Sequence, residues 1–337
     1  MRKLRLGIIG TGVAARRLHW PALERLSDRY QIVAVANRTR DKGEAFADLV
    51  GLDRACVYED YRQLLGRGDV EVVDLVLPPA LNYEGARAAA ASGIHVVCEK
   101  PIAVTMKEAR AMVALPQEFG VQILIAENFR YENAVRLGRS LIEQGELSAP
   151  FMMCYQWMQH VPQGDEMASR PWRREAVHAG GCLSDHGVHM IDVARYLMGE
   201  IRAVQAFGLH VREHLGGIDS AAYNLRFESG AIGSIQWSFG VASRQKWLLQ
   251  MWSDDGSLEI EPDEIRLCKP DQPEKVFTVS GPTSFVNEFE DFYEALVNGK
   301  KPLVTARDAL KDLEAILAVY RSAVVNEVVL LGEEERS

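Results

Sequence analysis

Three residues have types and spacing suited to proton transfer at a carbon–oxygen bond: Lys100, Asp185 and His189. A lysine at the end of a strand can donate a hydrogen bond to a hydroxyl and stabilise the alkoxide as it forms. Asp185 and His189 are four residues apart and so share one face of a helix, and a histidine beside a carboxylate suits proton transfer near neutral pH. With His186 this pair could instead ligate zinc, but no second set of Cys or His ligands accompanies them, so no metal is expected.

Each of these residues also has a plainer interpretation. Taken alone, Glu99 and Lys100 would be interpreted as a surface ion pair, and His189 as a histidine of the core. Gly180 and Gly181, just before the helix that would carry His189, predict a flexible approach to it. The chemistry therefore depends on what surrounds these residues along the chain.

A glycine-rich turn near the N-terminus fits the pattern G-x-G-x-x-A, follows an apolar strand and opens a helix. Its residues are Gly10, Thr11, Gly12, Val13, Ala14 and Ala15. Gly10 permits a tight turn, Gly12 lets the backbone approach a pyrophosphate, and Ala15 lets helix and strand pack closely. Because the N-terminus of a helix favours anions, the turn predicts dinucleotide binding; the alternative is a glycine turn of another α/β protein.

The end of the second strand bears on the choice between NAD and NADP. It has no carboxylate to bind the ribose 2′-hydroxyl and carries Asn37, Arg38 and Arg40 instead. Asn37 can hydrogen-bond a ribose oxygen, and the arginines can bind a 2′-phosphate or stack on adenine. The sequence favours NADP without excluding NAD, and the arginines could also belong to a solvated loop.

The first 126 residues alternate strand and helix patterns. Strands are predicted at 4–9, 31–36, 70–77, 94–98 and 121–126, and helices at 13–26, 83–92 and 105–119. This alternation predicts a doubly wound parallel sheet, an α/β Rossmann domain that binds NAD(P).

Residues 127–337 predict a second, α+β domain for substrate binding and oligomerisation. Strands at 151–159, 203–211, 221–227, 231–239 and 247–252 are separated in places by turn residues, and 223–227 alternates polar with apolar side chains. Helices follow at 285–297 and 306–325. We expect a large, mostly antiparallel open sheet.

Composition narrows the class of protein. The formal net charge of −9 argues against binding nucleic acid or an anionic membrane, and no apolar stretch approaches the roughly 20 residues of a membrane span. Five cysteines are scattered without a C-x-x-C pair, which favours a reducing cytoplasm.

The order of these motifs over nearly the whole chain resembles the Gfo/Idh/MocA family (glucose-fructose oxidoreductase, inositol dehydrogenase, rhizopine catabolism protein). The matching elements are the glycine turn, Pro78, Glu99-Lys100-Pro101, Gly180-Gly181 with Asp185, His189 and Asp192, and the tail at 287–292 and 299–302. The pairing of E-K-P with G-G-x-x-x-D-x-G-x-H-x-x-D makes the resemblance specific.

The resemblance implies an oxidoreductase that moves hydride between nicotinamide and a hydroxyl or carbonyl carbon of a sugar, inositol or related polyol. It implies that Lys100, Asp185 and His189 form the catalytic set, and that Trp172 and Arg173 lie in a loop over nicotinamide and substrate. The further expected cofactor contacts are Leu77, Pro78, Asn82, Glu99, Lys100 and Asn128.

One position departs from the family pattern. The family often carries a histidine a few residues after the proline of the fourth strand, where this chain has Asn82 as the nearest stand-in. Just after the sixth strand, Asn128 and Arg130 are expected to line the site.

Two other functions compete with a dehydrogenase: an NAD-dependent glycoside hydrolase or lyase with transient redox chemistry, and a non-catalytic ligand sensor. A sensor would not need the proton-transfer set.

The sheet of the second domain also suggests assembly. Apolar side chains on its strands are expected to form an open face that pairs two subunits, in a homodimer or homotetramer. They are Trp237, Phe239, Trp247, Leu249, Met251 and Trp252. The alternative is that these residues form ordinary core under the helices of the domain.

Overall fold

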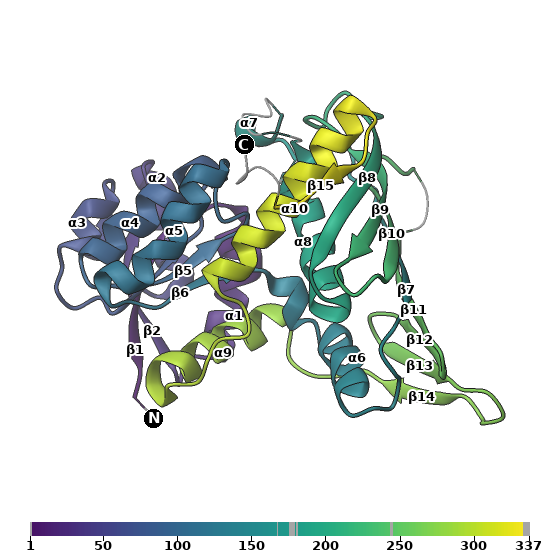
Figure 1. Cartoon of the computed structure of the whole chain (residues 1–337). Helices are drawn as coiled ribbons and strands as arrows, with labels where there is room; N and C mark the ends of the chain where they lie inside the picture. The colour runs from purple at the N-terminus through teal and green to yellow at the C-terminus, as the bar shows by residue number, and fades with distance from the viewer. Residues whose placement is uncertain (1, 167, 175–178, 180, 243–244, 333–337) are drawn as a thin grey trace. The chain divides into compact units, whose positions relative to one another are not determined.

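The computed structural model describes residues 2–166, 168–174, 179, 181–242 and 245–332. The chain forms two compact units, residues 1–128 with 283–310 and residues 129–282 with 311–337 (Figure 1). The expected boundary at 126 lies close to the first crossing between the units. Residues 283–310, which sequence analysis assigns to the second domain, fold with the first unit.

The first unit is built on a six-stranded sheet in the order β3-β2-β1-β4-β5-β6, in which every neighbouring pair is parallel. Its strands are β1 (Leu4–Ile9), β2 (Tyr30–Ala36), β3 (Val57–Tyr58), β4 (Val72–Leu75), β5 (His95–Glu99) and β6 (Ile123–Ala126). This is the strand order of a Rossmann sheet. From β1 the chain adds β2 and β3 on one side and β4, β5 and β6 on the other, so the strand order reverses between β1 and β4. The predicted doubly wound fold is confirmed.

Helices connect these strands. They are η1 (Ala15–His19) with α1 (Trp20–Arg25), α2 (Arg40–Val50), η2 (Arg54–Cys56), α3 (Tyr61–Leu65), η3 (Pro79–Leu81), α4 (Asn82–Ala91), α5 (Met106–Phe119) and, from the C-terminal part of the chain, α9 (Ser284–Asn298). At the start of α5, Thr105 accepts a hydrogen bond from the backbone of Glu108, a capping arrangement. Gly120 ends this helix with φ of 68°.

The second unit is built on a nine-stranded sheet in the order β14-β13-β12-β11-β7-β10-β9-β8-β15. Its strands are β7 (Met152–Met158), β8 (Ile201–Leu209), β9 (Ser220–Phe227), β10 (Ile232–Ser238), β11 (Lys246–Ser253), β12 (Gly256–Ile260), β13 (Glu264–Cys268), β14 (Lys275–Thr278) and β15 (Val329–Leu330). Only β7 and β10 pair in parallel, so the expected mostly antiparallel sheet is confirmed.

The helices of this part of the chain are α6 (Asn133–Glu143), α7 (Pro171–Arg174), α8 (Cys182–Met198) and α10 (Ala306–Val325), with η4 (Asn128–Tyr131) before α6. Helix α8 lies against β9 and β10, and α6 lies against β12 and β13. Residues along β9 alternate between buried and exposed, as expected for a sheet with one covered face. No helix in the described ranges is both long enough and apolar enough to span a bilayer.

The residues expected on the open face of this sheet mostly lie on its covered face. Trp237, Leu249 and Met251 are buried in the core, and the strand alternation places Phe239 and Trp247 on the same side. Trp252 alone of the six lies on the opposite side. Residues at every second position of a strand share one face. The sequence does not show which face of the sheet the helices cover, so the expectation of an open face was wrong for five of the six.

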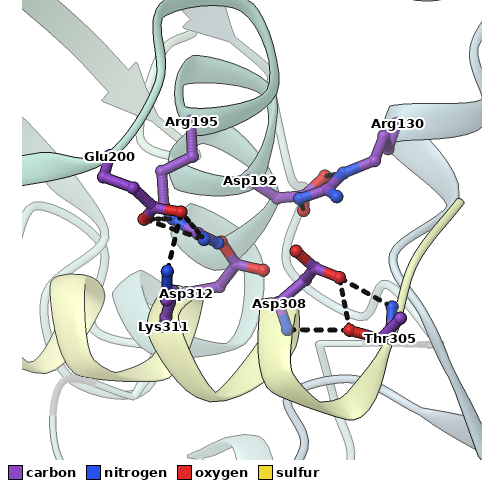
Figure 2. Close-up of polar contacts among 8 residues, drawn as sticks. All are labelled: Arg130, Asp192, Arg195, Glu200, Thr305, Asp308, Lys311 and Asp312. Atoms are coloured by element: carbon purple, nitrogen blue, oxygen red, sulfur yellow. Dashed lines mark hydrogen bonds and ion pairs between the residues drawn. The ribbon is translucent and has the colours of Figure 1, made fainter.

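Two buried arginines of the second unit are held by carboxylates (Figure 2). Arg130 binds Asp192 through both its Nε, at 3.1 Å, and its Nη2. Arg195 binds Asp312 and also donates to both oxygens of Glu200. Burial and the neighbouring Asp192 carboxylate raise the pKa of Asp312 well above its usual range. Arg130, expected to line the site, thus has its guanidinium bound to Asp192.

Removing one partner of a buried pair leaves the other charge uncompensated. We expect Asp192→Asn to lower the free energy of unfolding by about 3–5 kcal/mol, because Arg130 stays buried without its carboxylate. The measurement is the midpoint of chemical denaturation. The control is Asp48→Asn, which removes an exposed carboxylate paired with Arg54 and should leave the midpoint nearly unchanged. Equal midpoints for the two variants would contradict the expectation.

Candidate active site

The first unit gathers most of the predicted site residues at one edge of its sheet. The carboxyl ends of parallel strands meet at the same edge, where ligands of open α/β sheets bind. The glycine turn follows β1, Asn37-Arg38 follows β2, and Leu77-Pro78 follows β4. Glu99 ends β5 and Lys100 follows it, and Asn128 follows β6.

The glycine turn has the geometry that a pyrophosphate requires. Gly10 has φ of +95°, and a Cβ there would stand 2.2 Å from the carbonyl oxygen of Val76, so no other residue fits. A Cβ on Gly12 would meet nothing within 4 Å, which leaves open space beside the backbone. Ala15, the first residue of η1, is completely buried. The first N–H groups of a helix have no acceptor within it, so those of Val13 and Ala14, where this helix begins, suit an anion in that space.

Asn37 braces the turn from the end of β2. Its Oδ1 accepts from the backbone of Thr11 at 3.2 Å, and its Nδ2 donates to the carbonyl of Thr39 at 2.8 Å. One amide hydrogen of Asn37 remains for a ribose oxygen. Arg40 pairs with Glu44 at 2.7 Å, whereas no ion pair of the exposed Arg38 is found within the described part of the chain. Arg38 is therefore the better placed of the two arginines for a 2′-phosphate.

Asn82, expected to contact the cofactor, instead binds backbone carbonyl groups. Its side chain is completely buried, and its Nδ2 donates to the carbonyls of Glu99, at 2.7 Å, and Pro101, at 2.9 Å. Both amide hydrogens are thus engaged by backbone, and Asn82 braces the segment that carries Lys100. Leu77 and Pro78, nearby, remain partly exposed, and a Leu77 methyl lies 3.3 Å from the Cβ position of Gly10.

Lys100 follows the last residue of β5 and is half-buried. Its backbone N–H donates to Oε2 of Glu99 at 3.1 Å, and the Lys100–Pro101 peptide bond is cis. The carboxyl group of Glu99 therefore fixes the main chain at Lys100, and Asn82 holds the carbonyl groups on either side. At the next strand, Asn128 is buried and donates to the hydroxyl of Ser284 at 3.2 Å.

Helix α8 of the second unit carries Asp185 and His189, both buried, on one face as the spacing predicts. Arg173 of α7 binds Oδ2 of Asp185 at 2.9 Å. The ring of His189 stacks on Phe129, with centroids 4.3 Å apart and planes within 9°. Each of the two side chains is thus directed by a contact from outside α8: Asp185 by Arg173 and His189 by Phe129.

The approach to α8 is fixed at Gly181. This residue has φ of +56°, and a Cβ there would stand 2.4 Å from the carbonyl oxygen of Gly216. Cys182 donates its backbone N–H to the same oxygen. At Gly181, where a flexible approach was expected, the backbone thus packs closely against Gly216, while Gly180 lies outside the described residues. Trp172 and Arg173 form part of α7, with the guanidinium 4.6 Å from the indole centroid.

His186, next to the catalytic candidates, has an aromatic setting that was not predicted from the sequence. Nδ1 of His186 accepts from the indole N–H of Trp237 at 2.9 Å, so a neutral His186 carries its proton on Nε2. Rings of Phe129, Trp157 and Phe239 lie 4.7–5.6 Å from it. Tyr155 and Trp157 at alternate positions of β7, and Trp237 and Phe239 at the end of β10 and just after it, were the available signal. In the described ranges, no group of three His, Cys, Asp or Glu side chains could hold a metal ion.

These features define a Rossmann-type dinucleotide-binding unit joined to a second α+β unit. The chain belongs to the Gfo/Idh/MocA family: residues 4–127 match its model for an oxidoreductase with an NAD-binding Rossmann fold, and residues 135–259 match a C-terminal domain of the same family. It is an NAD(P)-binding oxidoreductase of this family, as the resemblance implied.

Relatives cover nearly the whole chain. D-apiose dehydrogenase of Paraburkholderia graminis is 27% identical over 99% of this chain and 92% of its own. D-xylose 1-dehydrogenase (NADP(+)) 2 of Haloferax volcanii is 27% identical over 96% of this chain and 99% of its own. The crystal structure of an oxidoreductase from Thermotoga maritima has a TM-score of 0.90 and 35% identity, and covers 98% of both chains.

The exposed guanidinium of Arg38 gives a test of cofactor choice. We expect Arg38→Ala to weaken NADP binding by roughly tenfold to a hundredfold while NAD binding changes little, since a charge-assisted contact to the 2′-phosphate is lost. Titration of both cofactors measures this. Arg40→Ala is the control and should change neither affinity much, because Arg40 pairs with Glu44. Equal losses for NAD and NADP would show that Arg38 does not read the phosphate.

Proposed function

We propose that this protein is a dehydrogenase or reductase that uses NADP or NAD and acts on a CH–OH group of a sugar, inositol or related polyol. The observation that carries the proposal is Lys100 at the ligand-binding edge of a parallel sheet, braced by Asn82 and Glu99. Relatives named for D-apiose and D-xylose support the substrate class. Residues 1–126 would bind the cofactor, and the second unit, residues 129–282 and 311–337, would bind the substrate.

The roles of the side chains follow from their chemistry. In oxidation, His189 takes the hydroxyl proton, and Lys100 donates a hydrogen bond to the developing alkoxide. Asp185 either orients His189 or binds an adjacent hydroxyl, and Arg173 limits the directions in which this carboxylate can turn. When bound, the nicotinamide ring accepts or supplies the hydride.

A panel of sugars, inositols and keto-sugars, followed by nicotinamide absorbance with each cofactor, tests the function. Net oxidation or reduction of one of these compounds supports a dehydrogenase. Cleavage of a glycoside with no net change in absorbance would replace the proposal with an NAD-dependent hydrolase or lyase. Binding without turnover would indicate a sensor.

The catalytic set gives a second test. We expect Lys100→Ala to lower kcat by on the order of 10²–10³, because alkoxide stabilisation is lost. His189→Asn should lower kcat by on the order of 10²–10⁴ and flatten the acid limb of the pH–rate profile for oxidation, because that limb reports protonation of the base. Lys107→Ala, at an exposed position of α5, is the control and should keep normal turnover. A folded, cofactor-saturated His189→Asn protein with near-normal kcat would refute the assignment of the base.

We propose further that the chain forms a homodimer or a dimer of dimers in the cytoplasm. Its five cysteines are all free, which supports a reducing compartment. The uncovered face of the second sheet carries the exposed side chains of Phe207, Leu209 and Ile232, which support an interface between copies.

Sedimentation at micromolar concentration tests the assembly. We expect the wild type to sediment as a dimer or larger, and Phe207→Glu to shift it toward monomer because a charge would be buried in the interface. Phe207 is 63% exposed in the single chain. Val324→Glu, on an exposed position of α10, is the control and should not change the assembly. A monomeric wild type would end the idea.

A further inference from the structure

His19 is a completely buried histidine of the first unit that the proposed reaction does not use. It lies at the end of η1, in the helix that begins at the glycine turn. Its Nδ1 lies 2.9 Å from Oδ2 of Asp74 in β4, and its Nε2 lies 3.0 Å from Oε1 of Glu99 in β5. The rings of Phe285 and Phe289 in α9 close the site at 5.6 and 5.7 Å.

Both ring nitrogens of His19 face carboxylates, which favours a ring with a proton on each. Burial alone would lower the pKa of His19, but the carboxylates of Asp74 and Glu99 outweigh it and raise the pKa well above its usual value. The Cys98 thiol and the Tyr30 hydroxyl also lie near these carboxylates, and their own pKa values are raised, chiefly by burial. Lys100 adjoins Glu99 in the sequence. The two carboxylates thus favour a proton on each ring nitrogen, and the ring bridges strands β4 and β5.

The Glu99 carboxylate connects His19 to the backbone of Lys100. One carboxylate oxygen of Glu99 contacts His19, and the other accepts the backbone N–H of Lys100 at 3.1 Å. Asn82 holds the carbonyls of Glu99 and Pro101. A continuous chain of contacts thus runs from the helix of the phosphate turn to the backbone of the lysine.

We propose that His19 is a positioning residue for Lys100, acting through the Glu99 carboxylate. The inference rests on the proposed role of Lys100 as the hydrogen-bond donor to the substrate oxygen. His19 holds Glu99 in the one orientation that also accepts the Lys100 N–H, and Asp74 holds the ring from its other side. Small displacements of a catalytic group can cost on the order of a hundredfold in rate, so this support bears on kcat.

Two substitutions distinguish a positioning role of His19 from a packing role. Both remove the ring, but only one keeps a hydrogen-bond donor toward Glu99. The amide of a glutamine can take the place of Nε2 and keep a donor toward Glu99, whereas the shorter amide of asparagine takes the place of Nδ1 and reaches only toward Asp74. We expect His19→Asn to lower kcat by roughly tenfold to a hundredfold, and His19→Gln to recover most of that loss. Affinity for NAD and NADP should change by less than about threefold in both.

His95→Gln is the matched control. His95 lies on the same strand, β5, at its opposite end, where its Nδ1 accepts from the backbone of Gln122. This variant should keep normal kcat. Equal losses of kcat in His19→Asn and His19→Gln, or no loss in either, would overturn the proposal, because they would show a packing role or none.

A substrate-free measurement keeps this test separate from that of the proposed function. In protein labelled with ¹⁵N-lysine, the backbone amide resonance of Lys100, assigned by its absence from Lys100→Ala, reports the hydrogen bond to Glu99. We expect it to move in His19→Asn and to stay near its wild-type position in His19→Gln. In the wild type, ring ¹⁵N shifts should show a proton on Nε2 of His19 at neutral pH. An unprotonated Nε2 could not donate to Glu99 and would overturn the proposal even if no sugar or polyol were turned over.

Discussion

The backbone at Gly10 approaches the carbonyl oxygen of Val76 so closely that any side chain there would collide with it. This contact joins the turn after β1 to the end of β4, the two strands between which the sheet reverses its order. The reversal sends the following helices to opposite sides, which leaves the crevice in which α/β sheets bind ligands. The open space beside Gly12 and the segment that carries Lys100 both depend on that edge being formed correctly.

In each unit, buried charged side chains fix the orientation of elements that carry site residues. In the second unit, two neighbouring residues grip α8: Phe129 stacks on His189, and Arg130 binds Asp192 one turn further along. Together they fix the rotation of the helix about its axis and therefore the direction of His189. A buried ion pair is a poor source of net stability compared with apolar packing, so its value here lies in fixing one geometry. His19, between two carboxylates of the first unit, does the same for Glu99.

Periodicity and turn chemistry were enough to predict the alternating first domain, the change to an antiparallel sheet and the helix with Asp185 and His189. These features are local, because each depends on residues within one or two turns of the chain. Prediction failed where the partner is remote in sequence. The covered and open faces of β10 and β11 depend on which side the helices pack, and the conformation of Gly181 depends on the carbonyl of Gly216. Neither relation leaves a pattern in the sequence.

Asn82 shows how a residue type can suggest one role while its surroundings impose another. An exposed amide at the end of β4 could contact a cofactor, but this one is buried, and its two hydrogens are taken by the carbonyls of Glu99 and Pro101. Backbone carbonyls at a strand end have no sheet partner, and burying them without a donor would be costly. Asn82 meets that need and, in doing so, holds the main chain on both sides of Lys100. At the position where the family often carries a histidine, this chain therefore has a buried amide that braces the main chain.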